Sequence, residues 1–268
     1  MTKILDGREL AGYIKERQFQ VVRNLARKPK LLIIRDSENP VILKYVGLKK
    51  RYGEDIGVVV EDVLAEGAEK IRETILAANK NPEINGIILQ LPILKPEKTE
   101  ELTNLIAPEK DVDGLNAATP DAERKFESAT ATAINWLLAG YNIELANKKI
   151  ALVGRGKLVG APLCRMWTNS GFDVTVFHRG SVLDELRNYE IIVAATGVPR
   201  LVKNEMISGG AVVVDAGTAS EKGELVGDVE EKVRERDDLA AITPKIGGVG
   251  PLTVTCLFEH VIEAAEKK

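Results

Sequence analysis

KKIALVGRGKLVG, residues 148–160, joins a short apolar run to a glycine-rich turn. A buried β-strand that turns through glycines into a helix has this pattern, because small residues let backbone N–H groups at the helix start approach a pyrophosphate. Glycine-rich turns also occur where a helix merely packs closely on a sheet. The stretch therefore predicts a strand–turn–helix unit of an α/β fold, and it favours nucleotide binding over the structural alternative.

Further apolar runs after this turn extend it into a doubly wound sheet. FDVTVFHR, EIIVAATGV, AVVVDAGT and LAAITP follow in order with helical stretches between them, so we expect five strands in one parallel sheet. Where an NAD-specific fold usually has Asp or Glu, the chain has His178 and Arg179. With Arg155 they predict a cationic site for the 2′-phosphate of NADP, although solvent-facing arginines are the alternative. The predicted cofactor-binding residues are Gly154, Arg155, Gly156, Val159, Gly160, His178, Arg179, Thr196 and Gly197.

The first half of the chain has its own α/β pattern. Asp6 and Glu9 form an aspartate variant of the capping box, before apolar positions at helical spacing to about Leu25. LLIIRD (31–36), IGVVVEDV (56–63) and INGIILQLPI (84–93) are apolar runs separated by helical stretches, which predicts a second parallel sheet. A last periodic segment, 252–268, predicts a helix that packs back on this first domain.

Composition excludes several classes of function. Lysine plus arginine (37) and aspartate plus glutamate (40) nearly balance over 268 residues, so nothing indicates a nucleic-acid or acidic-membrane partner. Cys164, Cys256, His178 and His260 are isolated in the sequence, and we expect no metal site and no disulfide scaffold. No leader and no membrane-length apolar stretch is present, so we expect a cytoplasmic protein.

KYVGLKKR, residues 44–51, places four basic side chains on a predicted helix capped by Ser37 or Asn39. At helical spacing, Lys49 falls inside an apolar arc that includes Leu48, Val41, Tyr52, Tyr45, Ile42 and Val46, whereas Lys44, Lys50 and Arg51 fall outside it. Lys49 can simply extend its ammonium to water, or it can be a partly desolvated lysine whose lowered pKa suits proton transfer. The helix alone favours the first interpretation.

Three other stretches place polar or glycine residues where a ligand could bind. Gln90 stands at the carboxyl end of a buried-type strand, before Leu91 and Pro92, where open α/β sheets bind ligands. KDVDGL brings Asp111 and Asp113 to one side of an extended segment, where they could bind amino groups or cap a turn. IGGVGPLTVT (246–255) is a glycine-rich loop that allows close backbone approach or only a sharp reversal.

Five motifs in register resemble the methylenetetrahydrofolate dehydrogenase/cyclohydrolase family, almost from end to end. They are Tyr45-Val46 with Lys49, Gln90–Pro92, Lys110–Gly114, the GR-x-x-x-VG-x-P pattern at Gly154, Arg155, Val159, Gly160 and Pro162, and Gly247–Pro251 with Thr253. The family's serine three residues before the tyrosine is Ile42 here, the serine after GR is Gly156, PCTP reads Ser128-Ala129-Thr130-Ala131, and the proline before GGVGP is Ile246. None of these departures removes a residue of the proposed centre.

The resemblance implies a bifunctional enzyme of one-carbon metabolism and purine biosynthesis. The family oxidises 5,10-methylenetetrahydrofolate with NAD(P)+ and hydrolyses the methenyl product to 10-formyltetrahydrofolate. Carried onto this chain, Lys49 is the acid/base group, Tyr45 lies near the pterin, Gln90 positions Lys49 and Asp113 binds the pterin's amino edge. The implied catalytic residues are Lys49, Tyr45, Gln90 and Asp113, and the implied substrate-binding residues are Tyr45, Gln90, Leu91, Pro92, Asp113, Gly248, Pro251 and Thr253.

The resemblance also implies a homodimer whose subunits have two domains across a cleft. Residues 1–120, with the C-terminal helix 250–268, would form the folate-binding domain, and 121–249 the Rossmann domain that binds NADP. Two alternatives stay open at this point. One is a shikimate-type dehydrogenase with the same two-domain plan, and the other is a non-catalytic NADP-binding regulatory protein.

Overall fold

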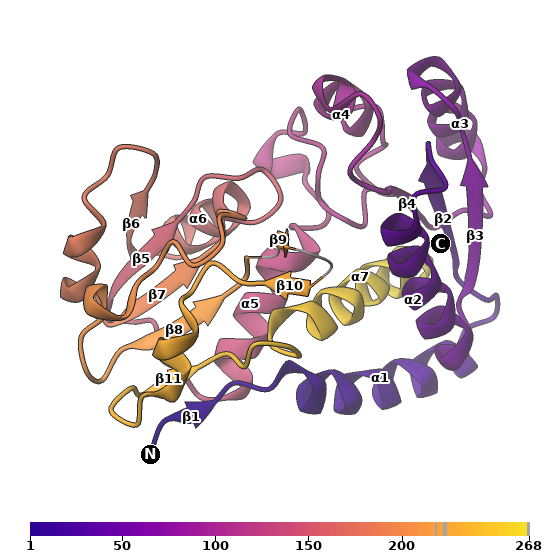
Figure 1. Ribbon diagram of the computed structural model, residues 1–268. Helices are drawn as coiled ribbons and strands as arrows, with labels where there is room; N and C mark the ends of the chain where they lie inside the picture. Colours follow the sequence, from indigo (N-terminus) through magenta and orange to yellow (C-terminus); the bar gives the residue numbers. More distant parts are fainter. Residues whose placement is uncertain (218, 222–223, 267–268) are drawn as a thin grey trace. The chain divides into compact units, whose positions relative to one another are not determined.

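The structure, a computed structural model, describes residues 1–217, 219–221 and 224–266 and forms two compact units (Figure 1). Unit 1 contains Met1–Ala11 and Thr130–Thr253, and unit 2 contains Gly12–Ala129 and the chain from Val254 onward. Each unit is built on its own parallel sheet. The predicted two-domain α/β fold is therefore confirmed. Among the described residues, none of the helices has the length and apolar character needed to cross a bilayer.

Unit 1 contains a six-stranded sheet in the order β1-β11-β8-β7-β5-β6, one strand more than the sequence predicts. Its strands are β1 (Lys3–Ile4), β5 (Lys149–Val153), β6 (Asp173–Phe177), β7 (Ile191–Ala194), β8 (Val212–Asp215) and β11 (Ala241–Ile242), with α5 (Ala129–Gly140) and α6 (Gly160–Asn169) between them in the chain. A separate antiparallel pair consists of β9 (Ala219–Glu221) and β10 (Glu224–Val226). Short 3₁₀ turns are η3 (Leu183–Asn188), η4 (Asn204–Met206) and η5 (Glu231–Glu235).

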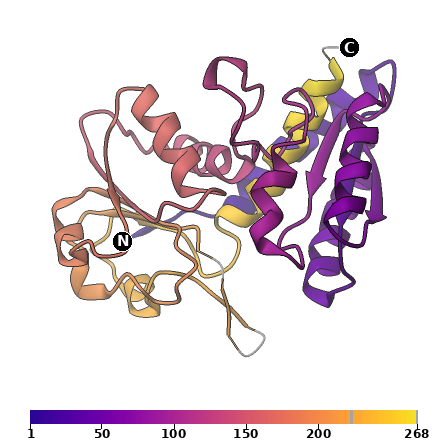
Figure 2. The same cartoon turned by 90° about the horizontal axis from the view of Figure 1, so that it is seen from above.

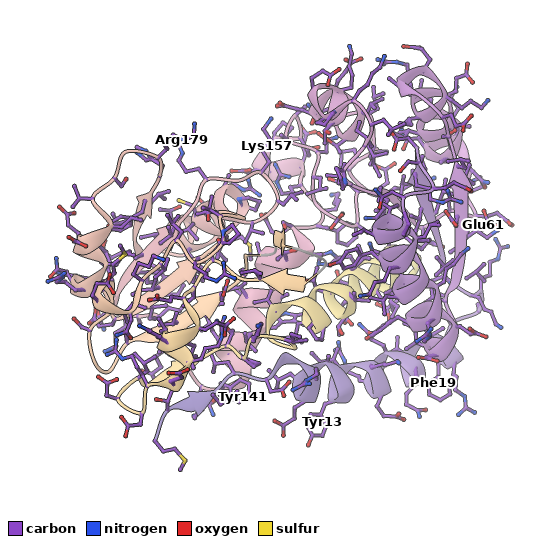
Figure 3. All side chains as sticks on the ribbon, viewed as in Figure 1. Tyr13, Phe19, Glu61, Tyr141, Lys157 and Arg179 are labelled. Carbon is purple, nitrogen blue, oxygen red and sulfur yellow. The ribbon has the colours of Figure 1, made fainter. Side chains whose placement is uncertain are left out.

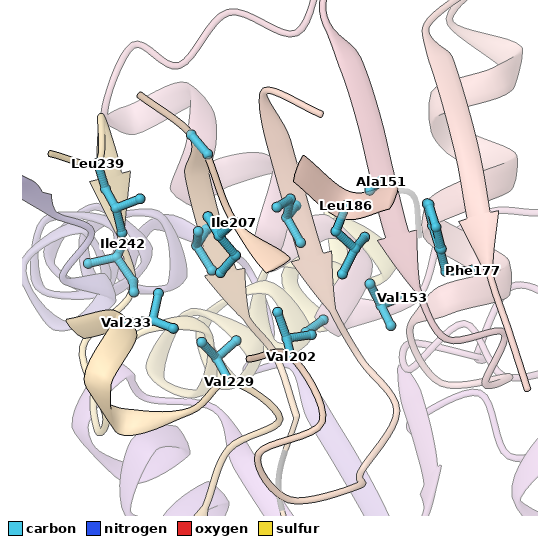
Figure 4. Packing of buried hydrophobic residues seen from close by; sticks show 14 residues of the cluster. Ala151, Val153, Phe177, Leu186, Val202, Ile207, Val229, Val233, Leu239 and Ile242 are labelled. Carbon is cyan, nitrogen blue, oxygen red and sulfur yellow. The ribbon is translucent and has the colours of Figure 1, made fainter. Parts of the chain in front are cut away.

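One face of this sheet forms a buried apolar core (Figure 4). Alternate residues of β5 and the neighbouring strands, such as Ala151 and Val153, pack against Leu186, Val202 and Val233 from the connecting segments. Because side chains alternate along a strand, this burial fixes which face of the sheet is covered. The carboxyl ends of the strands, and the loops that follow them, are held by this core.

Unit 2 contains a three-stranded sheet in the order β3-β2-β4. Its strands are β2 (Lys30–Arg35), β3 (Val59–Leu64) and β4 (Gly86–Leu89), and its helices are α2 (Pro40–Ile56), α3 (Ala68–Lys80), α4 (Thr99–Thr103) and the parts of α1 (Gly7–Asn24) and α7 (Val249–Glu266) that belong to it. Two 3₁₀ turns are η1 (Pro96–Lys98) and η2 (Asp121–Glu123). The predicted runs at 31–36 and 56–63 overlap β2 and β3, and the run at 84–93 contains β4.

The two faces of the unit 2 sheet are covered by different helices. Leu32 and Ile87 pack against Ile71 and Ile75 of α3, on one face. On the other face, a Cβ on Gly53 of α2 would meet the Val60 side chain, and one on Gly86 would meet Val261 of α7. Helices α2 and α7 lie side by side, as both views show (Figures 1 and 2), with the Tyr52 and Phe258 rings stacked at 4.9 Å. The C-terminal helix therefore belongs to this unit from Val254 onward.

The unit boundaries differ from the predicted division after residue 120 and around residue 250. Strand β1 pairs in parallel with β11, which brings the N-terminal residues into unit 1. The Tyr141 hydroxyl, labelled in Figure 3, accepts from the Asp6 N–H at 3.0 Å and donates to the Asp6 carbonyl at 3.1 Å. Because β1 has only two residues, its pairing leaves no periodic signal in the sequence.

Candidate active site

Helix α2 carries Lys49 on its buried side. The Asn39 side chain accepts from the Val41 N–H at 2.9 Å, Pro40 begins the helix, and Gly57 ends it at φ 85°. Its buried residues are Ile42, Val46, Gly53 and Ile56, at spacings of four, seven and three. Lys49 lies three residues after Val46 and four before Gly53, so it falls on this stripe. The expectation that Lys49 differs from its basic neighbours is confirmed, since Lys44, Lys50 and Arg51 are exposed.

The apolar arc expected on this helix is wider than the face that is buried. Val41 and Leu48 are 57% and 44% exposed, and Tyr45 is 38% exposed one turn before Lys49. Tyr52, in contrast, is only partly exposed, and its hydroxyl donates to the Gln18 side chain at 2.7 Å. An exposed apolar stripe therefore lies beside the buried stripe that carries Lys49.

Gln90 directly follows strand β4, and its side chain contacts Lys49. The Gln90 N–H continues the ladder by donating to the Ile34 carbonyl at 2.8 Å, which leaves its side chain at the strand's carboxyl end, 8% exposed as a residue. Its amide nitrogen donates to the Leu91 carbonyl at 3.0 Å, and its amide oxygen accepts from Lys49 Nζ at 2.8 Å. The Leu91–Pro92 peptide bond is cis. Since the Leu91 contact fixes the direction of the amide, Gln90 presents an acceptor to the lysine.

The segment 110–114 is anchored at both ends. Lys110 Nζ donates to three carbonyls at the end of α3, at 2.7–2.8 Å. The Asp111 carboxylate accepts from the Leu115 and Asn116 N–H groups at 3.2 and 2.8 Å. Gly114 has φ +66°, and a Cβ there would lie 2.4 Å from the Glu127 backbone, so the turn requires glycine. Asp111 therefore caps the turn, which is one of the two roles left open by the sequence.

His260 of α7 supports the same segment from another direction. Its Nδ1 lies 2.8 Å from the Val112 carbonyl, and its ring stacks on Phe126 at 4.9 Å. Because a carbonyl oxygen only accepts, Nδ1 must carry the proton. Sequence reasoning did not include His260 in the site, since a histidine on an apolar helix 148 residues from Val112 gives no local signal.

Lys49 and Asp113 shift each other's pKa in a desolvated setting. Burial lowers the pKa of Lys49, and the negative charge of Asp113 opposes that shift. Burial raises the pKa of Asp113, and the positive charges of Lys49 and His260 oppose the rise. Burial likewise lowers the pKa of His260. A lysine that releases its proton more readily than usual, next to a carboxylate, can carry protons during a reaction.

The glycine turn of unit 1 fits a dinucleotide. A Cβ on Gly154 would lie 2.4 Å from the Ala195 carbonyl oxygen, and one on Gly160 would lie 2.3 Å from the Gly154 oxygen. Gly154 and Gly160 therefore serve close packing. At the start of α6, the Ala161 N–H donates to the Gly156 carbonyl at 3.0 Å. The cap residue Val159 is apolar, so its side chain cannot accept from the first N–H groups of α6. Gly156 has open space around it.

Cationic side chains surround this turn. Arg155, His178 and Arg179 are exposed. Figure 3 shows Lys157 and Arg179 on the loops that follow β5 and β6, which are neighbouring strands. The His178 ring Nδ1 donates to the Arg179 carbonyl at 3.0 Å, and the backbone N–H of His178 donates to Ser181 Oγ at 3.0 Å. These loops offer positive charge where the sequence predicts a 2′-phosphate.

The other predicted ligand-binding residues also belong to unit 1. Thr196 and Gly197 follow β7 and are hydrogen-bonded to Asp228. The loop at Gly247 and Gly248 packs against the start of α1, where the Gly7 N–H donates to the Gly247 carbonyl at 2.8 Å. Gly248 is buried, and Pro251 and Thr253 are partly exposed on the first turns of α7. The described residues include no cluster of three or more His, Cys, Asp or Glu side chains that could hold a metal.

Comparison with known proteins decides the family. The model for the tetrahydrofolate dehydrogenase/cyclohydrolase catalytic domain matches residues 5–113, and the model for that family's NAD(P)-binding domain matches residues 128–268. The chain belongs to the tetrahydrofolate dehydrogenase/cyclohydrolase family. The resemblance that the five motifs indicate is thus confirmed, and the shikimate-type alternative is set aside.

Individual members of the family agree over the full length. The bifunctional protein FolD of Aquifex aeolicus is 36% identical over 286 residues, with 100% of this chain and 97% of the relative covered. The crystal structure of the bifunctional FolD enzyme from Campylobacter jejuni superposes with a TM-score of 0.92 at 29% identity, covering 100% and 99% of the two chains. The Trypanosoma brucei enzyme, solved with NADP and an inhibitor, has a TM-score of 0.89 at 30% identity, covering 99% and 98%.

Proposed function

We propose that this chain oxidises 5,10-methylenetetrahydrofolate with NADP+ to the 5,10-methenyl form and hydrolyses that cation to 10-formyltetrahydrofolate. The observation that carries the proposal is the hydrogen bond from the Lys49 ammonium to Gln90 Oε1, at 2.8 Å. Burial lowers the pKa of this lysine, and the charge of Asp113 opposes that shift. Full-length family membership supports both activities.

The oxidation depends mainly on positioning. NADP+ bound at the glycine turn supplies the acceptor for the hydride of the methylene carbon. The residues of this chain hold the two reactants together and exclude water, so no side chain has to transfer a proton in this step. Gly154 and Gly160 allow backbone approach, and Arg155, His178 and Arg179 supply positive charge for the 2′-phosphate. Gly248, Pro251 and Thr253 are proposed to contact the substrate from their loop.

The hydrolysis needs a proton carrier. Water attacks the methenyl carbon and loses a proton, which gives a neutral hydroxyl adduct. When the bond between that carbon and the ring nitrogen breaks, the nitrogen gains a proton and the hydroxyl loses its own to water as the formyl C=O forms, so one proton is released overall. Neutral Lys49 accepts the first proton and returns it to the nitrogen, so that one group serves as base and then as acid. Gln90 holds the lysine through an amide that does not titrate, and Asp113 binds the amino edge of the pterin. Tyr45 is proposed to pack near the pterin, and Leu91 and Pro92 to contact the substrate from the end of β4.

The decisive experiment is a spectroscopic assay of methylenetetrahydrofolate oxidation with NADP+ and NAD+ in parallel, followed by decay of the methenyl absorbance. We expect both steps, with NADP+ used more efficiently because of the cationic loops. Cofactor binding without turnover of either folate would instead support the non-catalytic alternative.

We propose further that the chain forms a homodimer and acts in the cytoplasm. Strand β3 pairs only with β2 in the described sheet, and its Val59, Val63 and Leu64 side chains are 37–39% exposed, which favours burial against a second copy. Cys164 and Cys256 are free thiols, as is usual in a reducing compartment. Light scattering after gel filtration tests the first proposal, where a monomeric mass would contradict it, and cell fractionation tests the second.

A further inference from the structure

Asp228 is a fully buried carboxylate that the proposed mechanism does not use. It follows β10, and its exposed fraction is 0%. One of its oxygens, Oδ2, accepts from three donors: the Thr196 N–H, the Thr196 hydroxyl at 2.9 Å and the Gly197 N–H at 3.2 Å. Hydrogen bonds to an ionised acceptor are roughly twice as strong as neutral ones. A single carboxylate oxygen therefore fixes the loop after β7.

The backbone N–H groups of the loop after β7 are therefore used for hydrogen bonds within unit 1. The Val198 N–H donates to Thr196 Oγ1 at 3.0 Å, and that hydroxyl donates in turn to Asp228. Three consecutive N–H groups, at residues 196–198, are thus engaged by Asp228 or by the hydroxyl bound to it. This loop cannot offer those groups to a phosphate, so a pyrophosphate is left to the β5–α6 turn.

The loop and the glycine turn are in direct backbone contact. A Cβ on Gly154 would lie 2.4 Å from the Ala195 oxygen, 2.8 Å from the Ala195 carbonyl carbon and 3.2 Å from Thr196 Cγ2. A packed interface of this kind has no free space into which the loop can shift. Displacement of Thr196 would therefore alter the turn that receives the pyrophosphate.

Asp228 is itself held in place from β8. Its N–H donates to Asp215 Oδ1 at 3.0 Å, and Asp215 is paired with Arg234 at 2.7 Å. The second oxygen, Oδ1, is buried without a hydrogen-bond partner among the described residues, and a Cβ on Gly217 would lie 2.0 Å from it. An unsatisfied buried oxygen is costly, and it persists where another requirement outweighs that cost.

We propose that Asp228 is a positioning residue of the cofactor site, which holds the 196–198 loop in the shape that the glycine turn needs to receive the dinucleotide. The inference rests on the proposed function, because it requires that NADP binds at this turn. It assigns Thr196 and Gly197 a specific role: they complete the site through carbonyl groups and van der Waals contact rather than through N–H donors.

The two activities of one chain provide the test. Only the oxidation uses NADP+, so Asp228→Asn should raise the KM for NADP+ roughly ten- to a hundredfold, as expected for weakened bonds to a charged group, and leave the hydrolysis rate within about twofold. Thr196→Val, which keeps both N–H donors to Asp228, should raise that KM only about threefold. Asp238→Asn is the control, because this exposed carboxylate pairs with Arg236 in the same unit, and both rates should be unchanged.

The outcomes separate the inference from simpler explanations. A wild-type enzyme that reduces no NADP+ with methylenetetrahydrofolate contradicts the proposed function itself. If the wild type is active and Asp228→Asn leaves the KM for NADP+ unchanged, the positioning role is wrong. Equal loss of both activities in Asp228→Asn, with normal NADP+ affinity in Thr196→Val, would also overturn it, since Asp228 would then serve only the folding of unit 1.

Discussion

The two units use buried carboxylates in opposite ways. In unit 1, Asp215 is paired with Arg234 at 2.7 Å, with side-chain exposures of 3% and 13%, and it also accepts from backbone N–H groups. In unit 2, within the part of the chain that the structure describes, no donor is hydrogen-bonded to the Asp113 carboxylate. The charges of Lys49 and His260 act on its pKa only through space. Fixed donors make Asp215 structural, whereas Asp113 keeps its acceptor capacity for a ligand.

The lysine of unit 2 shows the same contrast with the arginine of unit 1. Arg234 donates to the Asp215 carboxylate at 2.7 Å, and a guanidinium suits such a fixed ion pair rather than proton transfer. Lys49 donates to a neutral amide and has a lowered pKa. A titratable group with a non-titrating partner can change its protonation state without breaking its hydrogen bond. The comparison therefore favours unit 2 as the place of the proposed acid/base chemistry, and unit 1 as rigid support.

The largest expected effect follows replacement of the lysine. Lys49→Met keeps a long apolar side chain but has no proton to exchange, and we expect hydrolysis of the methenyl cation to fall by about 10²–10⁴-fold, with NADP+ affinity unchanged. Methenyl decay and cofactor fluorescence measure the two quantities. Lys44→Met is the matched control, because Lys44 is exposed on the same helix. Full hydrolysis in Lys49→Met would sink the assignment of the proton carrier.

Breaking the pair in unit 1 should instead cost stability. Arg234→Met leaves Asp215 as an unpaired buried charge and removes the donors to the Thr243 and Val229 carbonyls, so we expect a loss of about 3–5 kcal/mol in the free energy of unfolding. Chemical denaturation measures this loss. Arg8→Met removes an exposed, solvent-screened pair with Asp6, and it should leave the free energy of unfolding almost unchanged. Similar losses in the two variants would mean that the Arg234 pair is not desolvated.

Asp111 of unit 2 is a buried carboxylate that should make the free energy of unfolding depend on pH. Burial raises its pKa to about 6 from an ordinary value of 3.8, although the Asn116 and Leu115 N–H groups oppose the shift. The folded chain therefore holds a proton that the unfolded chain has released between about pH 4 and 6, and stability falls as pH rises through that window. Relative to the wild type, Asp111→Asn should gain about 3 kcal/mol in unfolding free energy between pH 4 and 7, at 1.36 kcal/mol per pKa unit. Denaturation curves that differ by a constant amount across this range would contradict the raised pKa.

Local periodicity predicted the elements well, because the signal for each lies within the element itself. The stripe from Ile42 to Ile56 has helical spacing, and the apolar run at 84–93 contains β4 with Gln90 at its end. Lys49 could be singled out because one charge on a buried stripe is a local anomaly. The membership of Lys49, Gln90 and Asp113 in one site came from the resemblance, since no spacing in one segment predicts a contact with another.

The features that sequence reasoning missed all depend on contacts between distant segments. Strand β1 has two residues and pairs with β11, more than 230 residues away. Asp228 binds a loop 32 residues earlier, and His260 supports Val112 from the far end of the chain. Isolated polar residues of this kind look like ordinary surface residues until the fold brings their partners to them.

The smallest expected effect probes the electrostatics of Lys49 directly. Gln90→Glu puts a carboxylate where the amide oxygen now lies, 2.8 Å from Nζ, and an opposite charge at that distance raises a lysine pKa. If neutral Lys49 is the base, as proposed, the acid limb of the hydrolysis pH profile should move to higher pH by about one unit, which is about 1.4 kcal/mol. Asp113→Asn removes the charge that raises the pKa of Lys49, so the acid limb of the hydrolysis pH profile of this variant should move to lower pH.

The opposite directions of these shifts make the test specific. Loss of a general packing role would lower the rate in both variants without moving the limb, and a changed substrate KM would disappear at saturating folate. If both limbs move the same way, or if neither moves while Lys49→Met is inactive, Lys49 does not act as the titrating base. Measuring kcat across pH 5.5–9.5, with the uncatalysed methenyl decay subtracted at each pH, distinguishes these cases, since kcat reports the groups that titrate in the enzyme–substrate complex.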